Sequence, residues 1–166
     1  ALEINFPVRH YTQFFVDHLE QLQKMMKNEV NAVVTYHDPC YLGRVNGIFD
    51  EPRQLLQAIP GVELFEMSHT RENSLCCGGG GGGMWLDGFQ WEKSQVRISD
   101  WRMREAVSAL GDSGNGTEDT RQRILTIACP YEAPRFDDST KTVKGAESLL
   151  VKDIAELIAE AIGLEG

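Results

Sequence analysis

Residues 32–40 read AVVTYHDPC, and this stretch decides the fold. Its first five residues form a short β-branched run without polar alternation, which is typical of a strand buried on both faces, as in parallel sheets. The sequence His37-Asp38-Pro39 ends that strand. Cys40 therefore follows the carboxyl end of a buried strand, where open α/β sheets bind their ligands.

Two further runs repeat this arrangement. Residues 62–67 (VELFEM) and residues 123–128 (RILTIA) also read as strands. Cys76 and Cys77 lie in the loop that follows the first run, and Cys129 directly follows the second. Because parallel strands end at a common edge, we expect all of these cysteines to lie together at that edge.

Helical patterns separate the strands along the chain. Apolar spacing, N-caps and terminal Pro or Gly residues predict helices over residues 10–26, 53–59, 95–110 and 153–162, and a fourth strand is predicted over residues 147–151. Alternating strands and helices are typical of the α/β class with a parallel sheet. We expect about four strands with helices on both faces, a three-layer fold of the Rossmann-like or flavodoxin-like type.

The composition is that of one domain with a hydrophobic core. The chain has 166 residues, of which 42% are hydrophobic, and domains usually run to roughly 100–200 residues. We expect residues 1–166 to form a single domain, with a flexible acidic insertion over residues 111–120. The chain begins with Ala1 rather than Met, so it is either a domain excised from a longer polypeptide or a chain that has lost its initiator.

The formal net charge of −9 argues against nucleic acid as a partner. Nucleic-acid binders neutralise phosphates with clustered Lys and Arg, whereas the 16 such residues here are spread along the chain. No apolar run approaches the roughly 20 residues that span a bilayer, and no signal-peptide pattern opens the chain. We therefore expect a cytoplasmic protein that does not insert into a membrane directly.

Four cysteines in an acidic intracellular chain indicate ligands or redox thiols rather than disulfides. Buried free thiols are the alternative. Neighbouring side chains of a strand point to opposite faces, so the pair Cys76-Cys77 fits a loop better than a core strand. Thiolates that converge on one point suit zinc or an iron–sulfur cluster. The glycines that follow, Gly78 and Gly79 first, allow backbone N–H groups to approach the bound sulfur atoms.

Four segments carry a resemblance: HDPCYLGR (37–44), SLCCGGGGGGMW (74–85), IACPYE (127–132) and VKDIAELIAEAI (151–162). Together they resemble the cysteine-rich CCG domain of heterodisulfide reductase and of the iron–sulfur subunits of glycolate oxidase and related Fe–S oxidoreductases. The resemblance covers roughly residues 30–163. That family's pattern is one Cys, a Cys-Cys pair and a final Cys-x-x-Cys. It implies five thiolates that can hold a non-cubane [4Fe-4S] cluster.

Carried over to this chain, the pattern matches Cys40, Cys76, Cys77 and Cys129, and Glu132 stands where the fifth thiolate is expected. We predict these five residues as metal ligands. Four thiolates suffice for an ordinary [4Fe-4S] cluster, and three thiolates with a carboxylate could hold zinc. Glu132 either occupies the vacated position or has turned to solvent, and both alternatives remain open at this point.

Other residues near these motifs receive simpler interpretations. We expect His37 to contact the bound cofactor as a donor outside the ligand shell, together with Gly78 and Gly79. The glycine run 78–83 satisfies the dinucleotide pattern G-x-G-x-x-G trivially, but the cysteine pair stands where the preceding strand should end, so nucleotide binding is disfavoured.

The resemblance implies an electron-transfer domain of a heterodisulfide reductase-like oxidoreductase. Such a domain relays electrons between a flavoprotein or ferredoxin partner and a disulfide or quinone acceptor. A membrane-anchored, quinone-reactive partner would bring it to the inner face of the membrane. We expect no catalysis by this piece alone. The alternative is a structural zinc domain that serves for partner docking.

Overall fold

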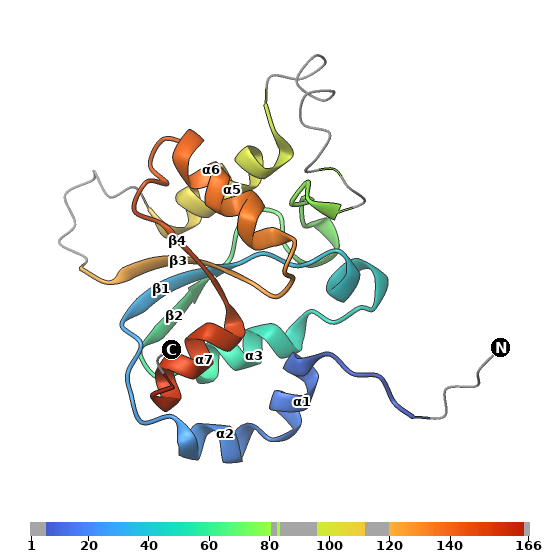
Figure 1. The fold of residues 1–166 in the computed structure, drawn as a ribbon, viewed down its shortest axis with the longest axis vertical. Helices are drawn as coiled ribbons and strands as arrows, with labels where there is room; N and C mark the ends of the chain where they lie inside the picture. Colours follow the sequence, from blue (N-terminus) through green and yellow to red (C-terminus); the bar gives the residue numbers. More distant parts are fainter. Residues whose placement is uncertain (1–5, 81–82, 84–95, 112–119, 165–166) are drawn as a thin grey trace.

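The computed structural model describes residues 6–80, 83, 96–111 and 120–164. In this part of the chain, four parallel strands form one sheet in the order β2-β1-β3-β4 (Figure 1). The strands are β1 (Ala32–Tyr36), β2 (Val62–Phe65), β3 (Gln122–Ile127) and β4 (Leu150–Asp153). The predicted parallel sheet of about four strands is confirmed.

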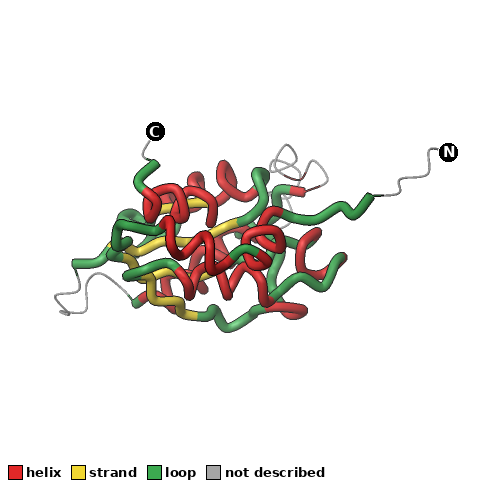
Figure 2. The backbone as a smooth tube through the Cα atoms, turned by 90° about the horizontal axis from the view of Figure 1, so that it is seen from below, coloured by secondary structure: helices red, strands yellow, loops and turns green. Residues whose placement is uncertain are grey.

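Helices cover both faces of this sheet (Figure 1). One layer consists of α1 (Tyr11–Asp17), α2 (Leu19–Met25), α3 (Asp50–Ala58) and α7 (Ile154–Ile162), and the other of α5 (Ile98–Leu110) and α6 (Glu132–Thr142). Seen from below in Figure 2, the helices of the first layer lie across the strands. The predicted three-layer α/β architecture is confirmed.

Each face of the sheet has its own hydrophobic cluster. Val34 and Tyr36 of β1 pack with the first layer, whereas Leu125 and Ile127 of β3 pack against α5 and α6. All five residues of β1 are buried, as the β-branched run predicts for a strand covered on both sides.

The chain leaves the two central strands in opposite directions. β1 leads to α3 in the first layer and then to β2, whereas β3 leads to α6 in the second layer and then to β4. The strand order is that of the flavodoxin-like sheet, and its switch point lies between β1 and β3. The crevice beyond the carboxyl ends of these two strands is therefore the expected place for a ligand.

The structure differs from the sequence prediction in several elements. Helix α3 begins at Asp50 rather than Arg53, and α5 begins at Ile98 rather than Gln95. The predicted helix over 10–26 is two helices, because His18 has φ −115° and ψ 25° and its ring contacts the Phe14 carbonyl. β2 ends earlier than expected, and β4 begins three residues later than expected. Helix α6 was not predicted at all. Asp153 caps α7 and left-handed Gly163 ends it, as expected.

Two expected features fall on residues that the structure does not describe. Most of the insertion over 111–120 lies outside the described residues, as does the start of the helix expected over 95–110. Among the helices that the structure describes, none combines the length and the apolar character needed to cross a membrane.

Candidate metal centre

The cysteines reach the carboxyl edge of the sheet on three separate loops. Cys40 follows β1 and precedes a single π-helical turn, η1 (Tyr41–Val45), a conformation that is frequent at functional sites. Cys129 follows β3, and Cys76 and Cys77 follow the 3-10 turn η2 (Arg71–Asn73). All four thiols are free. The prediction that the cysteine loops share this edge is confirmed.

Burial of the thiols is graded. Cys77 is buried, Cys40 and Cys129 are half-buried, and Cys76 is exposed. Cys40 and Cys76 line one small pocket together with Arg44, which lies close enough to lower the pKa of Cys76. One side of the cysteine group is therefore open to solvent or to a partner, and the other side lies in the core.

The two adjacent cysteines are hydrogen-bonded to each other. A hydrogen bond from Cys77 is the largest factor that lowers the pKa of Cys76, to about 5, while the same bond and burial raise the pKa of Cys77. The backbone N–H of Gly78 donates to Cys76 Sγ and that of Gly79 to Cys77 Sγ, each at 3.3 Å. These contacts therefore favour the thiolate form at Cys76 over Cys77.

Gly78 and Gly79 are required at these positions for different reasons. Gly78 has φ +75°, a conformation that side chains with a Cβ rarely adopt. At Gly79, a Cβ atom would lie 2.8 Å from the carbonyl oxygen of Tyr131. Both glycines expected to contact the bound cofactor thus direct backbone N–H groups at cysteine sulfur atoms.

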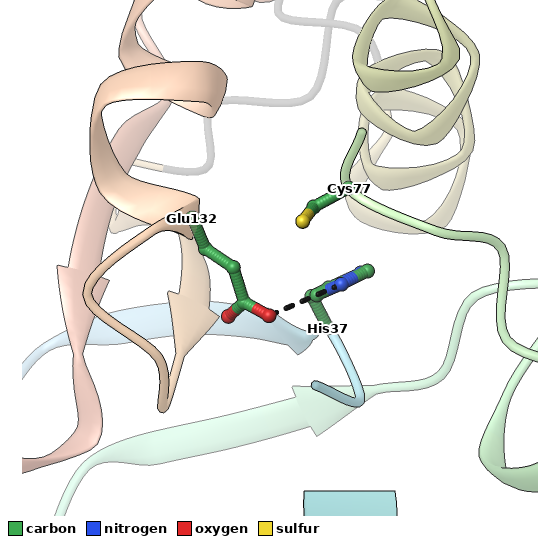
Figure 3. Close-up of side chains that lie close together, drawn as sticks. All are labelled: His37, Cys77 and Glu132. Atoms are coloured by element: carbon green, nitrogen blue, oxygen red, sulfur yellow. Dashed lines mark ion pairs between the residues drawn. The ribbon is translucent and has the colours of Figure 1, made fainter. Parts of the chain in front are cut away.

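The buried side chains of His37, Cys77 and Glu132 form a close group (Figure 3). One ligand atom each from His37, Cys77 and Glu132 lies within 4.8 Å of the other two. In Figure 3 the Cys77 thiol and the Glu132 carboxylate point toward the same space. The Glu132 side chain is only 2% exposed, so the alternative in which it has turned to solvent is wrong.

The Glu132 carboxylate is only partly satisfied. Its Oε1 lies 3.4 Å from His37 Nε2, and its buried Oε2 has no hydrogen-bond partner among the described residues. Burial raises the pKa of Glu132, against the opposing effect of the Ala128 backbone N–H near the carboxyl, and burial together with the charge of Arg102 lowers the pKa of His37. Burial thus favours the uncharged form of both groups, which lie 3.4 Å apart in a contact longer than an ordinary hydrogen bond.

These residues fit an iron–sulfur cluster or a thiolate-bound metal. Cysteines on three loops lie at one edge of the sheet, and Cys40 and Cys76 line the same pocket. Of the four thiols, Cys77 alone belongs to the close group with His37 and Glu132 among the described residues. Two N–H groups point at sulfur, and one buried carboxylate oxygen lacks a partner among the described residues. Buried polar atoms are normally hydrogen-bonded, so an orphaned oxygen beside a thiol is consistent with a position that binds a cation. The role of these residues as metal ligands stays a prediction.

Arg102 of α5 reaches this site and was not identified from the sequence. Its side chain is fully buried, and its Nε donates to His37 Nδ1 at 3.0 Å. It also donates to the His69 carbonyl, the Ser74 hydroxyl and the Glu105 carboxylate, at 2.6, 3.2 and 2.6 Å. One signal was available, because Arg102 shares a helical face with the buried Ala106.

Arg53 of α3 holds the same loop from the other face. It makes a two-pronged contact with Asp38, at 2.7 and 2.9 Å, and a second one with Glu66. Asp38 also accepts a hydrogen bond from the backbone N–H of Arg71 at 2.8 Å. The loop that carries Cys40 is therefore fixed at both His37 and Asp38.

Comparison with known proteins agrees with this geometry. Residues 34–109 match the family model of the cysteine-rich domain designated CCG. The chain carries a cysteine-rich domain of the CCG family. The match contains Cys40, Cys76 and Cys77 and ends before Cys129 and Glu132.

Proteins that are similar in sequence to this chain include three that are named as redox proteins. The chain is 36% identical over 165 residues to a subunit of the dihydromethanophenazine:CoB–CoM heterodisulfide reductase of Methanosarcina barkeri, a match that covers 98% of this chain and 36% of the relative. It is 32% identical over 155 residues to the probable iron–sulfur-binding oxidoreductase FadF of Bacillus subtilis, covering 93% of this chain and 20% of FadF. It is 30% identical over 165 residues to the EtfAB:quinone oxidoreductase of Syntrophomonas wolfei, a match that covers 95% of this chain and 21% of that protein.

The chain thus spans between about a fifth and about a third of the length of these relatives. A search of solved structures found no match.

Proposed function

We propose that this CCG domain holds an iron–sulfur cluster and relays electrons within a larger oxidoreductase. The observation that carries the proposal is the convergence of three cysteine loops at the switch point of the sheet, with backbone N–H groups directed at two of the sulfur atoms. A bound cluster would supply reversible one-electron transfer. The relatives named as iron–sulfur-binding and heterodisulfide-reducing proteins support the same class of function.

Each residue of the site would have a distinct task in holding the cluster. Cys40, Cys76, Cys77 and Cys129 would bind iron, and the N–H groups of the two glycines would offset the negative charge on sulfur. We propose a [4Fe-4S] cluster, because four thiolates suffice for it. Glu132 would take the place of the fifth thiolate with a harder oxygen donor.

The burial of the thiols suggests how electrons would enter and leave. Cys77 faces the core, whereas Cys76 is exposed beside Arg44. A partner that docks at the exposed side would approach the cluster closely without any opening of the fold. We propose that the electron donor is a flavoprotein or a ferredoxin-type protein, and that the acceptor is a disulfide or a quinone reached through another component of the assembly.

The short span of the chain relative to its relatives supports a domain rather than a complete enzyme. We propose that residues 1–166 form one CCG domain of a longer Fe–S oxidoreductase, that catalysis needs other domains or subunits, and that the assembly works on the cytoplasmic side of a membrane. The relative named as a quinone oxidoreductase is consistent with an acceptor reached through a membrane-bound partner.

Anaerobic reconstitution with iron and sulfide tests this function. We expect a brown protein with bound iron and sulfide, an electron paramagnetic resonance signal, and loss of both in Cys76→Ser and Cys129→Ser. His69→Ala, which changes an exposed side chain outside the thiol group, should retain them. A colourless protein with stoichiometric zinc after the same treatment would reject the electron-transfer function.

A specific observation favours zinc as the second candidate. Cys77 and Glu132 are both residue types that bind zinc, and their ligand atoms lie within 4.8 Å of each other. In this alternative the metal would fix the loops for docking of a partner. Metal analysis of protein purified without reconstitution distinguishes the two, because a structural zinc would be present at one equivalent from the start.

A further inference from the structure

Three buried side chains contact one another in series, and the last of them lies beside the Cys77 thiol. Arg102 Nε donates to His37 Nδ1 at 3.0 Å, and His37 Nε2 lies 3.4 Å from Glu132 Oε1. The three side chains are 0%, 1% and 2% exposed. Glu132 Oε2, at the end of this series, has no hydrogen-bond partner among the described residues and shares its space with the Cys77 thiol (Figure 3).

The direction of the first hydrogen bond determines the state of the ring. A guanidinium only donates hydrogen bonds and is not deprotonated in proteins. His37 Nδ1 must therefore accept with its lone pair, and the single ring hydrogen of the neutral imidazole lies on Nε2. Glu132 Oε1 lies 3.4 Å from Nε2 and is placed to accept that hydrogen.

We propose that Arg102 is a positioning residue of the metal centre. It holds His37 as an Nε2–H donor, and His37 in turn holds Glu132 Oε1 so that Oε2 faces the position of the metal beside Cys77. This inference rests on the proposed function, since a bound cation gives the free oxygen of Glu132 its partner.

The arrangement removes His37 from the ligand set. Zinc and iron bind a ring nitrogen through its lone pair. In His37, Arg102 occupies the Nδ1 lone pair and the other nitrogen carries the hydrogen. The buried group of His37, Cys77 and Glu132 therefore offers one sulfur and one oxygen donor but no nitrogen donor. The expectation that His37 lies outside the ligand shell thus acquires a physical cause in Arg102.

The surroundings of Arg102 suit it to this task. Its remaining N–H groups bind the His69 carbonyl, the Ser74 hydroxyl and the Glu105 carboxylate, so that the planar guanidinium cannot rotate away from His37. Ser74 lies two residues before Cys76 in the loop that carries the cysteine pair. A single side chain thereby links the position of that loop to the orientation of His37. A lysine, with one nitrogen on a flexible stem, cannot reproduce this fork of donors.

Nuclear magnetic resonance of the metal-free chain, labelled with ¹⁵N-histidine, tests the ring directly. We expect the His37 signals, assigned by their loss in His37→Asn, to show a protonated Nε2 and a bare Nδ1. Arg102→Gln should shift His37 toward a mixture of both tautomers. Arg104→Gln, which changes an exposed arginine on the same helix, should leave the tautomer as in the wild type. A wild-type His37 with hydrogen on Nδ1 would overturn the inference whether or not the protein binds a cluster.

Cobalt(II) titration of the metal-free protein tests the consequence for the metal. Loss of residues that orient metal ligands typically costs about 10- to 100-fold in metal affinity, and we expect losses in that range for Arg102→Gln and His37→Leu. His37→Gln should recover part of the loss, because its amide can donate to Glu132 as the ring does. In a Glu132→Gln background, each of these substitutions should cause little further loss of cobalt affinity.

The outcomes separate this inference from the proposed function. If the wild type binds cobalt but takes up no iron–sulfur cluster, the proposed function fails, and the cobalt and tautomer results still decide the role of Arg102. If the wild type takes up a cluster, and both His37→Leu and His37→Gln match it in cobalt affinity and in the spectrum of the cluster, Arg102 and His37 do not position a ligand. His37 variants give this answer even where Arg102→Gln fails to fold.

Discussion

Two buried arginines, on opposite faces of the sheet, donate hydrogen bonds to neighbouring residues of one loop. Arg53 of α3 binds Asp38, and Arg102 of α5 binds His37. Hydrogen bonds to Asp38 and Glu66 outweigh burial and raise the pKa of Arg53. For Arg102, burial outweighs the hydrogen bond to Glu105 and lowers the pKa. Arg53 is thus fully compensated by carboxylates, and Arg102 is not.

The difference indicates what each arginine does. A buried cation with two carboxylate partners is a clamp whose contacts are satisfied within the protein. Arg102 instead directs one of its donors at a neutral imidazole, which leads to the partly satisfied carboxylate of Glu132. The buried charge that is not fully offset, that of Arg102, therefore lies on the side of the loop that faces the metal centre. Residues at functional sites often depart in this way from what would be most stable.

Removing Arg53 should have the largest effect on stability. Arg53→Leu leaves Asp38, whose side chain is 2% exposed, as a buried charge without its main partner. Breaking a buried ion pair in this way costs about 3–5 kcal/mol. We expect a loss of this size in the free energy of unfolding, measured by urea denaturation of the metal-free protein. Arg9→Gln, which breaks an exposed pair with Asp17, should have little effect.

If Arg53→Leu and Arg9→Gln lose a comparable amount of stability, Arg53 does not act as a clamp. The proposed difference between Arg53 and Arg102 would then have no basis.

Arg102→Met should cost less stability than Arg53→Leu. The substitution leaves a neutral ring nitrogen without its donor, while Glu105 is 14% exposed and keeps the Ser68 hydroxyl as a partner. Loss of these hydrogen bonds should destabilise the fold by about 1–3 kcal/mol. Urea denaturation beside Arg53→Leu measures the ranking. If Arg102→Met proves the more damaging of the two, Arg102 is primarily a structural residue.

The two arginines also mark the limit of what the sequence could predict. The β-branched runs of β1 and β3 and the cysteines that follow them predicted the sheet and its functional edge, because strand patterns and switch points follow local rules. No local pattern marked the roles of Arg53 and Arg102, because Glu66, Asp38 and His37 lie 13, 15 and 65 positions away from the arginines that they contact. Only the folded structure brings His37 within 3.0 Å of Arg102.

Helix α6 was missed for a local reason. Pro134 stands in its first turn and Asp137-Asp138 follows, so the segment resembles a polar loop. Proline is compatible with a first turn, because its missing N–H has no helical partner there. The sequence therefore located Glu132 by motif spacing alone, and could not show that α6 begins at this residue and holds its carboxylate in the core.

Phe136 provides a smaller test of how rigidly His37 is held. Its ring meets the imidazole edge to face, with centroids 5.0 Å apart and an interplanar angle of 70°. Aromatic pairs of this kind contribute about 0.5–1.5 kcal/mol beyond burial. We expect Phe136→Leu to lower the free energy of unfolding by about that much more in the wild type than in a His37→Leu background. The second background measures the cost of the smaller side chain alone. Equal losses in both backgrounds would show that the ring contact does not hold His37.

Glu132→Cys should have the smallest effect on stability and the clearest effect on the cofactor. The change replaces a buried carboxylate that has one unsatisfied oxygen with a thiol, at the position where the family pattern has its fifth cysteine. A thiolate is a softer donor and suits an iron–sulfur cluster better. After anaerobic reconstitution we expect more iron and sulfide per chain and an altered electron paramagnetic resonance spectrum. Glu132→Gln, which keeps the shape without the anionic donor, serves as the control and should bind no more than the wild type.

The variant also sharpens the contrast between the two arginines. With cysteine at position 132 the series from Arg102 through His37 no longer ends at a carboxylate, so Arg102→Met should affect cofactor content less in this background than in the wild type. Arg53→Leu should affect it equally in both, because the partners of Arg53 are Asp38 and Glu66 and, among the described residues, no hydrogen bond or ion pair joins either of them to Glu132. Equal iron and sulfide content and identical spectra in the wild type and Glu132→Cys would mean that the side chain at position 132 does not reach the metal.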